Sequence, residues 1–151
     1  MNLPSAFKER TSRLLGESAY EALETALQSE APTSIRINTA KWKGILKSEK
    51  SVPWCEHGYY LSTRPAFTFD PLFHAGCYYV QEAASMFLAQ AMKQYVTSPV
   101  IMLDLCAAPG GKSTHLASLI GKDSILVSNE VIRSRATVLA DNIAKWGADN
   151  V

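Results

Sequence analysis

The stretch VIMLDLCAAPGGKS at residues 100–113 decides the fold. An apolar run ends in an acid, Asp104, and a turn of small residues then leads into a helical pattern. A strand, turn and helix of this kind bring backbone N–H groups to a helix N-terminus, beside a floor without bulky side chains. Nucleotide-like cofactors bind at such places. The residues that we predict to contact a cofactor are Cys106, Ala107, Ala108, Pro109, Gly110, Gly111 and Lys112.

A second apolar run, SILVSNE at residues 124–130, closes on Glu130. This acid lies 19 residues after Gly111, about the spacing at which a carboxylate on the second strand takes the ribose hydroxyls of a nucleotide. We therefore predict that Glu130 binds a ribose.

Three kinds of ligand compete for the turn. A dinucleotide fingerprint is not met, because the two glycines are adjacent. The end of a phosphate-binding P-loop is present in Gly111-Lys112-Ser113, but Cys106 stands where that loop needs its first glycine. The third ligand is S-adenosylmethionine, whose carboxylate suits a helix N-terminus and whose sulfonium suits an acid such as Asp104. We favour S-adenosylmethionine and keep a nucleotide-phosphate-binding protein as the alternative.

Composition limits the class of protein. The 151 residues are 47% hydrophobic and 19% charged, so a buried core is expected. A net charge of +1 gives no sign of a strongly basic nucleic-acid binder. No apolar run is long enough for a transmembrane helix, and the charged N-terminus differs from a secretory signal. Three cysteines without such a signal indicate reduced thiols and a cytoplasmic protein.

The order of elements predicts an α/β protein. We expect a small α+β N-terminal subdomain over residues 1–75 and the start of a Rossmann-like parallel sheet over residues 76–151. Two parallel strands are too few for a stable sheet, so the sheet should be incomplete, as in the front of a larger protein or half of a split one. In the N-terminal part we predict a helix over 4–29 broken at Gly16, a strand over 34–39, an exposed helix over 40–51, a short strand ending at Leu61 and a loop over 62–76. In the C-terminal part we predict a helix over 81–95 and strands at 100–105 and 124–129. A helix follows each of these two strands, and the second of these helices ends at Gly147.

Polar residues in the N-terminal half allow further predictions. In the strand over 34–39, Ile35 and Ile37 should face the core and Arg36 and Asn38 the solvent. Arg36 and Asn38, with Lys41, would then offer a basic cluster to RNA phosphates, although a solvated face explains them equally well. We expect no metal site, since the spacing of the four possible zinc ligands is unlike that of zinc proteins. These four are Cys55, His57, His74 and Cys77.

The segment DLCAAPGGK at 104–112 resembles the cofactor motif of the Sun/Fmu family of S-adenosylmethionine-dependent RNA cytosine-5 methyltransferases. The start LPSAF is similar to the bacterial branch that modifies small-subunit ribosomal RNA. Other segments agree with the family in the same order along the chain: SIRINT at 34–39, VPWCEHGYYL at 52–61, YVQEAASM at 79–86 and NE at 129–130.

The resemblance implies a methyl transfer from S-adenosylmethionine to carbon 5 of a cytosine in RNA. It implies that residues 106–112 contact the cofactor, that Glu130 holds its ribose, and that residues 1–75 help to hold RNA. The family uses two cysteines in PCSG-like and TCS-like motifs, and neither motif occurs in these 151 residues. No catalytic residue is therefore assigned within the chain, and the chain alone is not expected to methylate RNA. Cys106 is expected to pack as a small residue of the cofactor turn.

Overall fold

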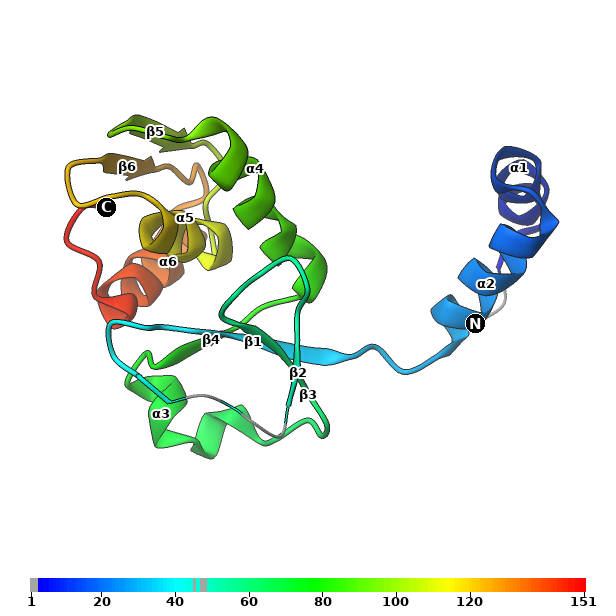
Figure 1. Ribbon diagram of the computed structural model, residues 1–151, viewed down its shortest axis with the longest axis horizontal. Coiled ribbons are helices and arrows are strands. Elements are labelled where there is room, and N and C mark those ends of the chain that lie inside the picture. Colours follow the sequence, from blue (N-terminus) through cyan, green and yellow to red (C-terminus); the bar gives the residue numbers. More distant parts are fainter. Residues whose placement is uncertain (1–2, 45, 47–48) are drawn as a thin grey trace. The chain divides into compact units, whose positions relative to one another are not determined.

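The computed structural model describes residues 3–44, 46 and 49–151 of the chain (Figure 1). The chain forms two compact units, one ending at Pro32 and one spanning Thr33–Val151. The predicted division near residue 75 falls inside the second unit, and it stays a prediction.

The first unit is a pair of helices, α1 (Ser5–Leu15) and α2 (Glu17–Gln28). Gly16 lies between them with φ of 80°, a left-handed value that favours glycine. The predicted break at Gly16 is therefore confirmed. Lys8 of α1 forms an ion pair with Glu24 of α2, with 2.7 Å between Nζ and Oε1.

The second unit begins with an antiparallel sheet in the order β2-β3-β1-β4. Its strands are β1 (Thr33–Ile37), β2 (Lys50–Ser51), β3 (Gly58–Leu61) and β4 (Tyr78–Val80). Both faces of β1 are covered, one by the apolar cluster around Ile35 and Ile37 and the other by Thr114 and Trp146 against Arg36, and Ser34 to Asn38 are all buried. The prediction that Arg36 and Asn38 face the solvent is therefore wrong. The helix predicted over 40–51 is also absent from the described part of that segment, which holds turns and β2; residues 45, 47 and 48 lie outside the described residues.

The connection from β3 to the parallel strands contains more regular structure than predicted. The expected loop over 62–76 holds a short 3-10 helix, η1 (Phe67–Phe69), and one turn of helix, α3 (Pro71–His74). Strand β4 was not predicted. The expected helix over 81–95 begins as a 3-10 segment, η2 (Ala83–Phe87), and continues as α4 (Leu88–Tyr95).

The last part confirms the predicted strand-helix-strand-helix unit, made of β5 (Ile101–Asp104), α5 (Gly111–Leu119), β6 (Ile125–Ser128) and α6 (Arg133–Trp146). Strands β5 and β6 are parallel, with Asp104 opposite Ser128. Helices α5 and α6 lie on the same side of this strand pair (Figure 1). Leu126 faces that side and is buried against α4 and α5, whereas half of the surface of Val127 is exposed. Gly147, with φ of 77°, ends α6 as predicted.

No helix in the described part of the chain combines the length and the apolar character needed to cross a membrane.

His115 of helix α5 packs against the connection between β2 and β3. This side chain is buried, and its Nε2 lies 3.8 Å from the Sγ of Cys55. Burial, with a smaller contribution from the charge of Arg36, lowers the pKa of His115 to about 3. The imidazole is therefore neutral in the folded protein at neutral pH.

We predict an acid-sensitive contribution from His115 to stability. The unfolded chain takes up a proton near the ordinary pKa of 6.5 and the folded chain does not until about 3. The free energy of unfolding therefore falls as the pH is lowered between these values, with a limiting slope of about 1.4 kcal/mol per pH unit from this group. Urea unfolding at a series of pH values should show that His115→Gln flattens this slope. Equal slopes in wild type and His115→Gln would contradict the assignment.

Candidate cofactor site

A hydrogen bond between Ser113 and Asp104 joins the two ends of the turn after β5. The Oδ2 of Asp104 accepts a hydrogen bond of 2.7 Å from the Oγ of Ser113, in the first turn of α5. The strand end and the helix start are thus held together across the intervening small residues. Since Asp104 already has this partner, its predicted approach to a sulfonium stays a prediction.

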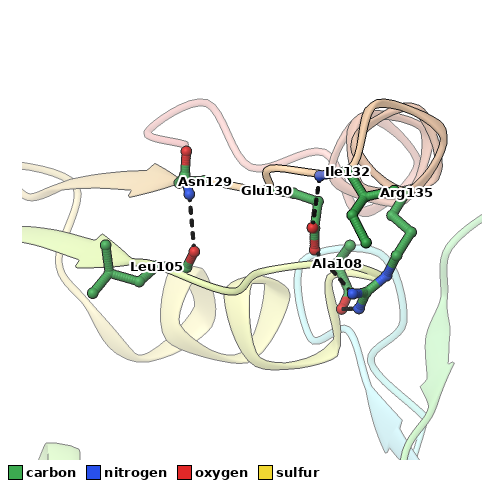
Figure 2. A network of polar contacts seen from close by, with 6 residues as sticks. All are labelled: Leu105, Ala108, Asn129, Glu130, Ile132 and Arg135. Atoms are coloured by element: carbon green, nitrogen blue, oxygen red, sulfur yellow. Dashed lines mark hydrogen bonds and ion pairs between the residues drawn. The ribbon is translucent and has the colours of Figure 1, made fainter.

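Asn129, directly after β6, fixes the turn from the side. Its backbone N–H donates to the carbonyl of Asp104 at 2.8 Å, and its carbonyl accepts from the N–H of Ala107 at 2.9 Å. Its side-chain Nδ2 donates to the carbonyl of Leu105 at 2.9 Å (Figure 2). Three hydrogen bonds from one residue therefore set the position of the turn relative to the second parallel strand.

Helix α6 supplies two more donors to the turn. Arg135 donates through Nη2 to the carbonyl of Ala108 at 2.8 Å, and Asn142 donates through Nδ2 to the carbonyl of Pro109 at 2.7 Å. Tyr79 of β4 also donates through its hydroxyl to the carbonyl of Pro109, at 3.3 Å. Side chains from two distant elements therefore meet at the middle of the turn.

The remaining carbonyls of the turn are bonded at the start of α5. The N–H of Gly110 donates to the carbonyl of Ala107 at 2.8 Å, and the N–H of Thr114 to the carbonyl of Gly110 at 2.8 Å. The carbonyl of Gly111 accepts from Thr114 Oγ1 at 3.2 Å and from Arg36 Nη2 at 3.4 Å. Every carbonyl from residue 107 to residue 111 is therefore bonded within the protein.

Unlike these carbonyls, the N–H groups at the start of α5 have no hydrogen-bond partner within the described part of the chain. The N–H groups of Gly111, Lys112 and Ser113 belong to the first turn of the helix, where no intrahelical acceptor exists. No acceptor for them lies elsewhere in the described part of the chain. Three N–H groups that converge at the positive end of a helix bind a carboxylate or a phosphate.

Small residues keep the turn accessible. Ala107 and Ala108 are buried against Leu139 of α6, whereas Cys106, Pro109 and Lys112 are exposed. Gly110 has φ of 108°, and a Cβ there would lie 3.3 Å from Cδ1 of Leu139. Glycine at this position thus satisfies both the backbone conformation and the close packing of α6.

Glu130 follows Asn129 at the end of β6, beside the turn (Figure 2). Its side chain is only 4% exposed. Oε1 accepts from the N–H of Ile132 at 3.0 Å, and Oε2 lies 3.5 Å from Nη1 of Arg135 without receiving a hydrogen bond. Since Arg135 also bonds Ala108, one guanidinium connects the acid to the cofactor turn.

Arg36, predicted to face RNA, is a buried cation beneath the turn. Its Nε donates to Gln81 Oε1 at 2.9 Å and its Nη2 to Thr114 Oγ1 at 2.7 Å. The guanidinium carbon lies 4.4 Å from the ring centroid of Trp146, an attractive cation–π contact. Burial lowers the pKa of Arg36 to about 9. The predicted contact with RNA phosphates is corrected here, because the side chain is only 2% exposed and its Nε and Nη2 donate to acceptors within the protein.

Asn38 and Lys41 hold the end of α6. Asn38 is buried and donates through Nδ2 to the carbonyls of Gly76 and Trp146, so its predicted exposure to RNA is also wrong. Lys41 is exposed and donates through Nζ to the carbonyl of Lys145 at 2.6 Å, a favourable place for a cation near a helix C-terminus. Its predicted contact with RNA stays a prediction.

The four possible zinc ligands do not form one cluster. In the residues that the structure describes, no three metal-binding side chains gather at one point. Cys55 contacts His115 instead, and His74 Nε2 lies 2.9 Å from the carbonyl of Thr68.

Several residues of the site could not be singled out from the sequence. A lone Arg, Asn or Thr inside a helix carries no local signal that its side chain reaches a backbone carbonyl far along the chain. The residues missed in this way are Tyr79, Thr114, Asn129, Arg135 and Asn142.

The fold and the site are those of a Rossmann-like α/β protein, with a strand-turn-helix of the kind at which nucleotide-type cofactors bind. Residues 3–83 match the family described as the N-terminal domain of 16S rRNA methyltransferase RsmF, and residues 92–151 match 16S rRNA methyltransferase RsmB/F. The chain belongs to this family of 16S rRNA methyltransferases. The resemblance to RNA methyltransferases of the Sun/Fmu type is thereby confirmed.

Similar proteins include two named ribosomal RNA small subunit methyltransferase F. The chain is 32% identical to the one from Pectobacterium atrosepticum over 99% of its own length, and 32% identical to the one from Vibrio parahaemolyticus over 98%. It spans 34% of the length of each relative.

Solved structures show the same fold. A methyltransferase homolog protein from Pyrococcus horikoshii is 31% identical with a TM-score of 0.81, and the match covers 99% of this chain and 52% of that one. NSun6 from Pyrococcus horikoshii, in a structure with SFG, is 16% identical with a TM-score of 0.76, covering 98% of this chain and 64% of that one. These neighbours confirm the predicted fold class.

We predict that adding one methyl group to the turn at Gly110 lowers the free energy of unfolding. Gly110→Ala forces an L-residue into φ of 108° and brings its Cβ against Leu139, so urea unfolding should show a loss of about 1–3 kcal/mol. Gly121→Ala is the matched control, because a Cβ there meets no atom within 4 Å. Its effect should stay within about 0.5 kcal/mol. Equal effects of the two substitutions would contradict this account of the turn.

Proposed function

We propose that this chain holds the methyl donor in an S-adenosylmethionine-dependent RNA cytosine-5 methyltransferase that acts on small-subunit ribosomal RNA. The single observation that carries the proposal is the pairing of free helix-start amides with an acid, Glu130, at the end of the next strand. Membership of the 16S rRNA methyltransferase family supports the type of reaction and of substrate.

Each part of the donor has a fitting partner. The amides of Gly111, Lys112 and Ser113 bind its carboxylate, and Ala107 and Ala108 form the floor against which it packs. Glu130 accepts hydrogen bonds from the ribose hydroxyls; its Oε2 has no hydrogen-bond donor among the described residues. The remaining predicted contacts, from Cys106, Pro109, Gly110 and Lys112, belong to the same proposal. When bound, S-adenosylmethionine supplies an electrophilic methyl group.

Arg135 would change partner when the ribose arrives. Its side chain is half exposed, and its Nη1 lies 3.5 Å from the carboxylate that the ribose would use. A hydroxyl donor can replace this contact, while Nη2 keeps its bond to Ala108. Arg135 thereby holds the turn in place whether or not the donor is bound.

We assign no nucleophile to the three cysteines of the chain. Cys55 and Cys77 are buried, and the exposed Cys106 belongs to the cofactor turn. A covalent mechanism that makes carbon 5 of cytosine nucleophilic needs a thiolate at carbon 6, and in the family this comes from motifs absent from residues 1–151. The thiols of this chain are all free, which accords with a reducing cytoplasm. Residues 1–75 are proposed to help hold RNA, and residues 76–151 to hold the donor.

Titration calorimetry tests the donor and the role of Glu130. S-adenosylmethionine should bind and ATP should not, because the turn lacks the first glycine of a P-loop. Glu130→Gln should weaken the binding of S-adenosylmethionine about tenfold to a hundredfold, since hydrogen bonds to a charged group are worth about 1.5–3 kcal/mol.

Asp123→Asn is the matched control, because it removes an exposed carboxylate just before β6, at the end of the strand opposite to Glu130. It should leave the affinity unchanged. Tight binding of ATP, or equal affinities of wild type and Glu130→Gln for S-adenosylmethionine, would refute the proposal.

A further inference from the structure

A hollow of about 500 Å³ lies beside the cofactor turn. We call it the basic aromatic hollow and define it by six of its lining residues, which come from the segment between β3 and η1, from η1 and α3, from β4 and from α6: Arg64, Phe67, Phe73, Tyr79, Asn142 and Lys145.

The hollow borders the turn directly. Tyr79 and Asn142 line it, and both donate a hydrogen bond to the carbonyl of Pro109, at 3.3 Å and 2.7 Å. A molecule in the hollow therefore lies one residue layer from the proposed donor site. The function described above does not use this surface.

The hollow carries positive charge without compensation. Its lining includes Arg64 and Lys145 and no Asp or Glu. Neither cation forms an ion pair with any carboxylate in the described part of the chain. Partial burial lowers the pKa of Lys145, so an anion brought to this place would stabilise its charged form.

Each cation lies over an aromatic ring. The guanidinium carbon of Arg64 is 5.6 Å from the centroid of Phe67, and Nζ of Lys145 is 4.3 Å from the centroid of Phe73. The three rings of the hollow are neither fully buried nor fully exposed, so part of each ring can still meet a ligand. Cations that bind phosphates, next to flat rings on which bases stack, are the combination that proteins use to hold single-stranded nucleic acid.

We propose that the basic aromatic hollow binds a single-stranded segment of the RNA substrate, with backbone phosphates at Arg64 and Lys145 and a base against the rings. This inference rests on the proposed function for its substrate class. An acidic peptide would satisfy the charges but leave the rings without a base, and a duplex keeps its bases stacked within the helix.

Binding of RNA to the full chain tests the proposal. The probe is a short fluorescein-labelled single-stranded RNA, followed by anisotropy at several salt concentrations. The double variant Arg64→Glu, Lys145→Glu should lose at least about tenfold in affinity. The slope of log affinity against log salt should fall in magnitude by about 1.4, because each lost phosphate contact on a single strand contributes about 0.7.

Two further variants make the result specific. Lys93→Glu with Lys122→Glu makes the same change in net charge at exposed lysines outside the hollow, and should lose much less affinity. Arg64→Lys with Lys145→Arg keeps both charges and should retain most of the binding. Unchanged affinity for S-adenosylmethionine shows that each variant is folded.

The outcomes separate this inference from the proposed function. If wild type binds the RNA and the hollow variant binds it equally well, the inference is overturned and the proposed function stands. If wild type binds no RNA but still binds S-adenosylmethionine, the inference alone is overturned. Tighter binding of a duplex of the same sequence, or equal competition by polyglutamate, also overturns the inference.

Discussion

Hydrogen bonds to the backbone carbonyls of the turn after β5 are the constraint on which the rest of the structure depends. A turn rich in Ala and Gly has many accessible conformations, and fixing it costs conformational entropy. Hydrogen bonds from α5, α6 and β4 to the carbonyls of residues 107–111 offset this entropy cost. With these carbonyls satisfied, the N–H groups at the start of α5 remain available to a ligand.

The antiparallel sheet takes part in this arrangement through Arg36. Its guanidinium bonds Gln81, Thr114 and the carbonyl of Gly111, and stacks on Trp146 at the end of α6. A buried cation without a carboxylate is costly, and here it is stabilised by neutral oxygens and an aromatic face instead. The sheet that precedes the parallel strands is thus part of the support for the cofactor turn.

The elements that the sequence predicted well are those with strong local signals. Apolar runs closed by Asp104 and Glu130 marked the two parallel strands, and Gly16 and Gly147 marked helix ends because their backbone conformations favour glycine. The prediction that one side of β1 faces solvent was wrong. Alternation shows only that the two faces of a strand differ, and a strand can bury polar side chains that find hydrogen-bond partners. The support from Arg135 and Asn142 could not be predicted, since each reaches a carbonyl about 30 residues earlier in the chain.

The central claim is that free amides at the start of α5, facing the acid of the neighbouring strand, hold the methyl donor. Backbone amide resonances of the nitrogen-15-labelled chain, titrated with S-adenosylmethionine, test it most directly. The largest shifts should fall on Gly111, Lys112 and Ser113, with a second group around Glu130. Saturable binding that leaves these four amides unmoved while shifting residues elsewhere would contradict the account.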